Sequence, residues 1–323
     1  MRPLAFRLAP VGALVAVLAT SAAAGPYRAP RTASGAPDLQ GVWTNLSLTR
    51  YLRPPEATAL TLDDKAAAEL EAKLAAKAKT TVDEVGGRDS EWWDGAHLGR
   101  INGKARTSWI TSPADGQAPL NAEGERRRAA DRASATGGLD NPESIRPTDR
   151  CVIPTWAAVG PPMLNAPYSA FYKIVQTPDA VAILAEMNSE VRIIRLGGAR
   201  AGVAAAGWTG ESVGRWEGET LVVETTNFHP RESGRLAPFF LSPGGRVTER
   251  LTRVSPTEIR YAFTVEDSTV LTAPVRGEMP FLASAAPIYE AACHEGNYAL
   301  PGILAGARKA EADARATKAA AGR

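Results

Sequence analysis

The chain has 323 residues, of which 37 are basic and 35 acidic, giving a formal net charge of +2 at pH 7. This length allows one large domain or two smaller ones. The balanced charge, without a basic stripe that carries interleaved aromatic residues, argues against nucleic-acid binding.

Residues 1–24 have the pattern of a cleaved signal peptide. Arg2 and Arg7 form a positive start, an apolar run follows, and alanines at 22–24 supply the small residues that signal peptidase reads. The apolar run is too short to span a bilayer, which needs about 20 residues, and no later stretch is long and apolar enough. We therefore expect cleavage after Ala24, a periplasmic or secreted protein, and no stable membrane insertion.

Residues 25–150 are expected to form loops and helices that pack on the rest of the protein. Residues 37–43 predict a turn into a first strand that buries Trp43. Residues 61–79 predict a helix, with acidic residues at its positive N-terminal end and Ala, Leu, Glu and Lys in its body. Asn121 is expected to cap a second, charged helix that ends near residue 133.

Residues 151–301 change to short β-rich runs separated by turn residues. The predicted strands cover 171–177, 180–187, 191–196, 212–216, 220–226, 246–254, 258–266 and 272–278. This spacing predicts an antiparallel meander, which must hide its edges by closing as a barrel or stacking as a sandwich. The expected fold is therefore mainly β and similar to calycin or lipocalin folds, with a few peripheral helices. Residues 302–323 are expected to form a C-terminal helical tail.

Charged side chains within the predicted strands leave two interpretations open. In a half-buried sheet they would face water. In a barrel with a partly polar interior, five of them would line a cavity: Glu186, Arg192, Glu224, Arg250 and Glu266. Glu186 and Glu224 favour the second interpretation, because each follows an apolar run near the end of a strand.

Several sequence blocks resemble a large family of exported bacterial proteins that is abundant in acidobacteria and in some proteobacteria. The most distinctive are PDLQGVW at 37–43, GRWEGETLVVETTNF at 214–228 and YEAACHEGNY at 289–298. The resemblance covers nearly the whole mature chain and implies a secreted, β-rich domain. Relatives often have a histidine where this chain has Asn188, and if that histidine acts in the relatives, the resemblance implies altered chemistry or none in this member.

Residues 289–298 hold the densest group of reactive side chains, including one of two cysteines and one of three histidines. His294 can act as an acid or a base near neutral pH. Glu290 would share a face with His294 on a strand, and Glu186 or Glu224 could supply the carboxylate instead. These four residues are the candidate catalytic groups.

The candidate substrate-binding residues come from other parts of the chain. Arg192 or Arg250 could bind an anionic group or stabilise a developing oxyanion. An aromatic wall and one amide complete the set, which is Trp208, Trp216, Tyr289 and Asn297. Core packing is the alternative role for each aromatic side chain.

The two cysteines, Cys151 and Cys293, are expected to form a disulfide, because export delivers them to an oxidising compartment. The bridge would close a loop of about 140 residues and contribute roughly 4–5 kcal/mol. The alternative is a nucleophilic Cys293 activated by His294, but adjacent residues on a strand point to opposite faces.

Other chemistries find little support in the sequence. No H-E-x-x-H, C-x-x-C or H-x-H spacing indicates a metal site, and the paired glycines are typical of turns, not of cofactor phosphate loops. Residues 210–214 have the spacing of a serine nucleophile elbow, but they lie in a predicted hairpin. We therefore expect no metal and no cofactor.

Three classes of function remain for such a protein. The first is a cofactor-independent acid–base enzyme, a lyase, isomerase or hydrolase, that acts on a small organic molecule. The second is a periplasmic protein that binds or carries a small ligand without catalysis. The third is a structural envelope protein, which predicts no sizeable pocket.

Overall fold

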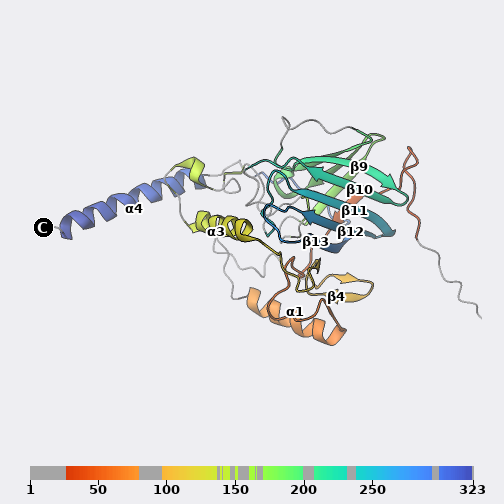
Figure 1. The fold of residues 1–323 in the computed structure, drawn as a ribbon, viewed down its shortest axis with the longest axis horizontal. Coiled ribbons are helices and arrows are strands. Elements are labelled where there is room, and N and C mark those ends of the chain that lie inside the picture. The colour runs from red at the N-terminus through yellow and green to blue at the C-terminus, as the bar shows by residue number, and fades with distance from the viewer. Residues whose placement is uncertain are drawn as a thin grey trace, which may run out of the picture.

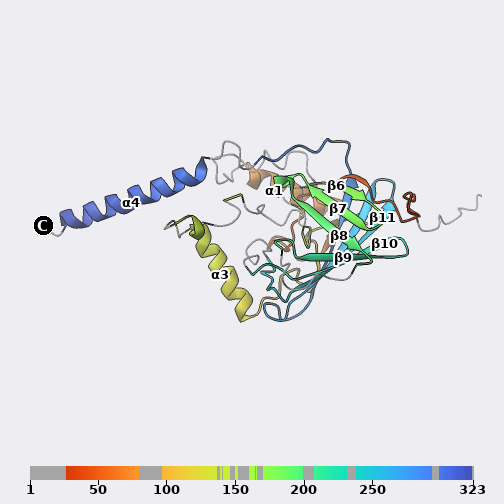
Figure 2. The same ribbon diagram turned by 90° about the horizontal axis from the view of Figure 1, so that it is seen from above.

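The computed structural model describes residues 27–79, 97–136, 139, 141–145, 150–151, 160–163, 165, 170–198, 207–230, 238–292 and 298–321. Within these residues, nine strands close into a barrel, because β1 pairs with both β6 and β13. Figures 1 and 2 show the barrel with helices around it. The expected mainly β fold with peripheral helices is therefore confirmed, and it is a barrel rather than a sandwich.

The barrel strands follow the predicted β-rich runs closely. Their bounds are β1 Gly41–Thr44, β6 Phe171–Gln176, β7 Ala180–Ala185, β8 Val191–Leu196, β9 Glu211–Glu217, β10 Thr220–Thr226, β11 Arg246–Ser255, β12 Glu258–Glu266 and β13 Val275–Ala283. Neighbouring strands are antiparallel at every contact except one, because β8 and β9 run parallel with Ile194 opposite Ser212. The expectation of a purely antiparallel meander is wrong at this point.

The N-terminal region adds a smaller sheet and a helix beside β13. Strands β2 Thr61–Leu62, β3 Arg100–Ile101 and β4 Lys104–Arg106 form this sheet, and helix α1 Asp64–Ala78 packs on it through Ala67 and Leu70. Strand β5 Ile110–Ser112 pairs with β13 outside the ring. The α1 N-cap is Asp63, whose Oδ1 accepts a hydrogen bond from Ala66 N at 2.8 Å.

Two further helices lie outside the barrel wall. Helix α3 Ala122–Thr136 begins after Asn121, whose Oδ1 accepts hydrogen bonds from the backbone N–H groups of Glu123 and Gly124, as its predicted cap role requires. Helix α4 Ala299–Ala321 has no buried residue among those described and projects away from the barrel (Figures 1 and 2). No helix in the described part of the chain is long and apolar enough to cross a membrane.

The two ends of the barrel differ. At one end, here called the hairpin end, short turns join β6 to β7, β9 to β10 and β11 to β12. At the opposite end, here called the loop end, lie residues 186–190, 227–230, 238–245 and 267–274. The described N-terminal segment runs across the hairpin end, where Gln176 Oε1 accepts a hydrogen bond from Leu39 N at 2.6 Å.

Strand alternation fills the barrel interior with large side chains. On β12, the residues predicted to share one face, Ile259, Tyr261, Phe263 and Val265, are all buried. Aromatic rings from β6 and β13, the strands on either side of β1, pack beside them, with the Tyr172 and Phe281 ring centroids 5.2 Å apart.

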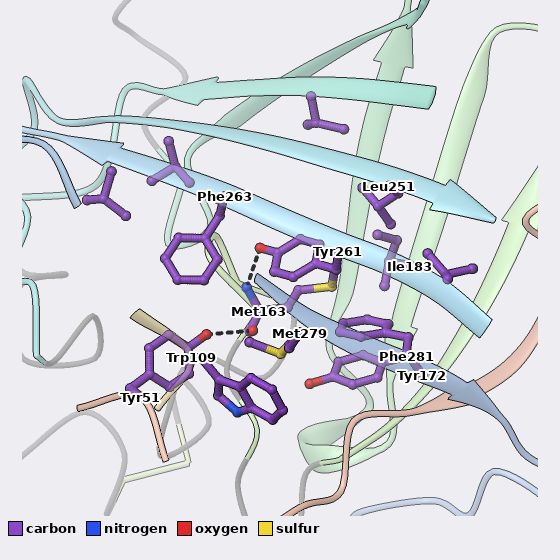
Figure 3. Close-up of a cluster of buried hydrophobic side chains, with 14 of the residues drawn as sticks. Tyr51, Trp109, Met163, Tyr172, Ile183, Leu251, Tyr261, Phe263, Met279 and Phe281 are labelled. Carbon is purple, nitrogen blue, oxygen red and sulfur yellow. Dashed lines mark hydrogen bonds between the residues drawn. The ribbon is translucent and has the colours of Figure 1, made fainter. Parts of the chain in front are cut away.

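The segment that contains Met163 occupies the interior toward the loop end (Figure 3). Met163 N donates to the Tyr261 hydroxyl oxygen at 2.9 Å, and the Tyr51 hydroxyl donates to Met163 O at 2.7 Å. Tyr51 also packs against Phe239, with ring centroids 6.0 Å apart. The barrel is therefore a packed scaffold at this level, not an empty chamber.

Candidate functional site

A buried ion pair crosses the barrel interior between Arg192 on β8 and Glu249 on β11. The two residues are 2% and 0% exposed. Both terminal nitrogens of Arg192 bond to the Glu249 carboxylate, with Nη1 to Oε1 at 3.1 Å. The other side chains that bond to this pair come from β9, β10 and β12. The resulting hydrogen-bond network takes one polar side chain from each of five consecutive strands, β8 to β12.

The partners of this ion pair satisfy most of its hydrogen-bonding capacity. Arg192 Nε donates to Ser212 Oγ at 2.9 Å and Nη2 donates to Thr225 Oγ1 at 3.2 Å. The Tyr261 hydroxyl donates to Glu249 Oε1 at 2.7 Å. Burial, followed by the Glu249 charge, raises the pKa of Tyr261 well above its ordinary value of 10.0. Because its charges are paired and its donors are used, the network has the form of a structural element of the barrel.

Of the five charged residues predicted to line a cavity, only Arg192 lies in the barrel interior. Glu224 is on the outer face of β10 and pairs with Arg246 at 2.8 Å. Arg250 is on the outer face of β11 and pairs with Glu217 at 2.9 Å. Glu266 is exposed, and Glu186 follows the last residue of β7. For Glu224, Arg250 and Glu266 the first interpretation is therefore correct, because their strand positions are in the outward phase and face water. Glu186 lies beyond the end of β7 and not in the barrel interior.

The sequence analysis missed Glu249, although alternation held a signal for it. Glu249 shares the inward phase of β11 with Val247 and Leu251, which are both buried. A charged residue in phase with two apolar neighbours indicates a paired interior charge. Arg192 on β8 supplies the opposite charge.

Two of the predicted site residues meet at the loop end. Glu186 Oε2 accepts a hydrogen bond from Tyr289 N at 3.0 Å, which ties the start of the 289–298 block to the end of β7. The Tyr289 side chain is 67% exposed, and Glu290 beside it is also exposed. His294, Asn297 and Cys293 lie outside the described residues, so their predicted roles are not tested by the structure.

A second contact at the loop end joins Trp208 to a histidine that the sequence analysis did not nominate. The rings of Trp208 and His229 stack with centroids 4.1 Å apart. Backbone contacts hold the two segments together, since His229 N donates to Gly207 O at 3.2 Å. This arrangement follows from the hairpin of β9 and β10, in which Glu211 at the start of β9 lies opposite Thr226 at the end of β10. The predicted hairpin therefore held a signal for this contact.

An open pocket of about 470 Å³ lies at the hairpin end of the barrel. Trp216, near the end of β9, and Leu196, at the end of β8, contribute apolar walls, and both pack against the barrel core. The other lining residues come from the N-terminal segment and two turns, and they are Arg31, Ser34, Gly35, Ala36, Pro37, Thr177, Pro178 and Gly218. Mouths of barrels are common places for small-molecule sites.

Neither a metal cluster nor the predicted disulfide can be built from the described residues. In those residues, no group of three or more His, Cys, Asp or Glu side chains is placed to hold a metal ion. Cys151 is buried, and its predicted partner lies outside the described part of the chain. The bridge between Cys151 and Cys293 therefore stays a prediction.

The fold and the pocket define a closed, mixed β-barrel protein with an open pocket at one end. Comparison with protein-family models, curated proteins and solved structures finds no match. The family resemblance of the three sequence blocks thus remains a prediction, and function has to be argued from the site.

Proposed function

We propose that the protein is an exported β-barrel protein that binds a small organic molecule in the pocket at the hairpin end. The observation that carries this proposal is the open pocket of about 470 Å³ over the apolar side chains of Trp216 and Leu196. Small-molecule sites combine a concave, mostly apolar wall with a few polar groups. The signal-peptide pattern of residues 1–24 supports export.

The N-terminal segment gives this pocket a fixed wall. Leu39 N donates to Gln176 Oε1, and Gln176 Nε2 donates to Pro37 O at 3.1 Å, so the segment is bonded to β6. Within the segment, Thr32 N donates to Ala36 O at 2.9 Å. A wall that is ordered before the ligand arrives lowers the entropic cost of binding.

A pocket-filling variant tests the proposal. Ala36→Trp places a large side chain in the pocket lining without removing a barrel contact, and it should abolish binding of any ligand found by a small-molecule screen of the purified protein. Val175→Ala, which changes an exposed residue on the outer wall of β6, is the control and should bind normally. Unchanged affinity in Ala36→Trp would place the ligand elsewhere and reject this assignment.

The second candidate is a cofactor-independent acid–base enzyme, a lyase, isomerase or hydrolase, at the loop end. The hydrogen bond between Tyr289 N and Glu186 Oε2 favours it, because Tyr289 is the first residue of the 289–298 block and Glu186 is a predicted catalytic carboxylate. In this proposal His294 transfers the proton, and Glu290 or Glu186 orients it.

Turnover separates the two candidates. A binding protein returns its ligand chemically unchanged, whereas the enzyme converts it and loses at least about 100-fold in rate on His294→Ala, as expected for loss of a general acid or base. Glu186→Gln should lower the rate with little change in affinity. Product formation that survives His294→Ala rules out the acid–base assignment.

A further inference from the structure

We infer that the ligand of the hairpin-end pocket is a small organic anion, an apolar molecule with one carboxylate, and that Arg31 selects it. This inference rests on the proposed function of that pocket. Some polar groups of the pocket lining are already hydrogen-bonded within the fold, whereas others can still bind a ligand, and this difference supports the inference.

The lining has four polar side chains, Arg31, Ser34, Thr177 and Trp216, and the indole N–H of Trp216 is buried without a hydrogen-bond partner among the described residues. The two hydroxyl side chains are engaged in their own turns. Thr177 Oγ1 accepts from Ala180 N at 3.0 Å, which closes the turn between β6 and β7. Ser34 Oγ lies 2.9 Å from Thr32 Oγ1. The donor hydrogens of both hydroxyl groups are used within the fold, since Thr177 Oγ1 donates to Ala180 O at 3.3 Å and Thr32 Oγ1 donates to Ala36 O, which leaves Ser34 as the donor to Thr32. Their remaining lone pairs cannot bind a carboxylate.

Arg31 is the charged residue of the lining. Its Nη2 pairs with Glu219 Oε1, while the other Glu219 oxygen accepts from Ala29 N at 3.3 Å. Among the described residues, no partner bonds to Arg31 Nε or Nη1. A guanidinium group has five N–H donors, so Glu219 fixes Arg31 in place and leaves donors for a second carboxylate.

The surrounding charges set the expected strength of this selection. Glu217, on the hairpin between β9 and β10, pairs with two arginines, Arg215 and Arg250. Hydrogen bonds from these arginines lower the pKa of Glu217, and the bond from Arg250 is the larger cause. Asp179, next to Pro178 of the lining, has the opposite charge to Arg31. The Arg31 side chain is 44% exposed, and exposed ion pairs are screened by solvent and salt. The preference for a carboxylate is therefore modest, about two- to fivefold.

Matched ligand pairs test the inference. Benzoate, 2-naphthoate and octanoate are each compared with the corresponding primary amide by isothermal titration calorimetry at low and high salt. We expect the carboxylate of a bound pair to bind about two- to fivefold more tightly at low salt and this advantage to shrink at high salt. Arg31→Gln should remove the advantage by weakening the carboxylate more than the amide, whereas Glu219→Gln should enlarge it.

The outcomes distinguish the inference from the proposed function. If a carboxylate and its amide bind equally well, and Arg31→Gln affects both equally, the pocket binds small molecules but the anion assignment is wrong. If no member of any pair binds the wild-type protein, or if Ala36→Trp leaves binding intact, the pocket assignment and the inference are both overturned. Circular dichroism of each variant confirms that the barrel is intact.

Discussion

Arg192 and Glu249 face each other across the barrel interior, and each is the main charged partner of the other. Their side chains come from β8 and β11, and both are almost completely buried. Transfer of two charges from water into a protein interior costs several kcal/mol per ion, which pairing only partly offsets. The pair therefore contributes less to net stability than its geometry suggests. Removal of one partner alone is nevertheless costly, because it leaves the other charge buried without a partner.

Single substitutions in this ion pair should be far more harmful than the double substitution. Arg192→Met or Glu249→Leu leaves one buried charge without its partner and should lower the free energy of unfolding by about 3–5 kcal/mol. The double variant removes both charges and should recover most of that loss. Urea unfolding followed by circular dichroism measures all three. Single variants that each lose less than about 1 kcal/mol would show that the pair is open to water.

The buried tyrosines predict a loss of stability at alkaline pH. Burial raises the pKa of Tyr51, Tyr172 and Tyr261 above the ordinary value of 10.0. The unfolded chain then releases these protons as pH rises above about 10, while the folded protein keeps them, so stability falls. Each such tyrosine contributes about 1.4 kcal/mol per pH unit in that range.

Tyr261→Phe isolates one part of this pH dependence. The substitution removes the hydrogen bonds to Glu249 and Met163 and should lower the free energy of unfolding by about 1–3 kcal/mol at neutral pH. It should also reduce the slope of stability against pH by about 1.4 kcal/mol per unit above pH 10. Urea denaturation between pH 9 and 11 gives the slope, and an identical slope in the variant would contradict this assignment.

Gly277 is required by close packing between β13, β12 and β5. An added Cβ would overlap the Phe263 ring and lie 2.8 Å from the backbone oxygen of Trp109. Gly277→Ala should therefore destabilise the protein by about 1–3 kcal/mol through overpacking. Gly198→Ala is the matched control, since its nearest contact would be Arg195 Cβ at 3.7 Å. Equal melting temperatures for the two variants would disprove the packing argument.

The predicted disulfide can be tested directly. Peptide mapping without reduction should recover the Cys151 and Cys293 peptides as one linked species. Cys151→Ser should then lower the free energy of unfolding by up to roughly 4–5 kcal/mol, because the loop is long. Alkylation of both cysteines in the folded, unreduced protein would reject the bridge.

Local patterns predicted the strands well because burial and turn chemistry act over short distances. The face of β12 that holds Tyr261 follows directly from alternation, and the turns of the hairpin end contain Pro178, Gly218 and Pro256, as the sequence indicated. Glu249 was recoverable from the same alternation. Glu224 and Arg250 face outward because they alternate with buried apolar residues of their strands, which agrees with the interpretation that in-strand charges face water.

Long-range placement was beyond the sequence. The parallel contact between β8 and β9 places Ile194 opposite Ser212, and local periodicity gives no information about which strands become neighbours. The pocket has the same origin, since Arg31 and Trp216 are far apart in the chain and meet only when the N-terminal segment crosses the barrel end. Neither could be derived from residue spacing.

The short strand β1 has a consequence for how the protein folds and aggregates. Its residues 41–44 pair with residues 171–174 of β6 and, through Trp43 and Thr44, with residues 282–283 of β13. The ring therefore closes only when the first and last strands have both been made, and such distant contacts form slowly. Until then the sheet has open edges at β1 and at β13, or at β12 in a chain that has not yet made β13, and these edges can pair with other chains. A nascent or truncated chain that lacks β13 is thus the form most prone to aggregate, and the time it spends unclosed sets its need for a chaperone.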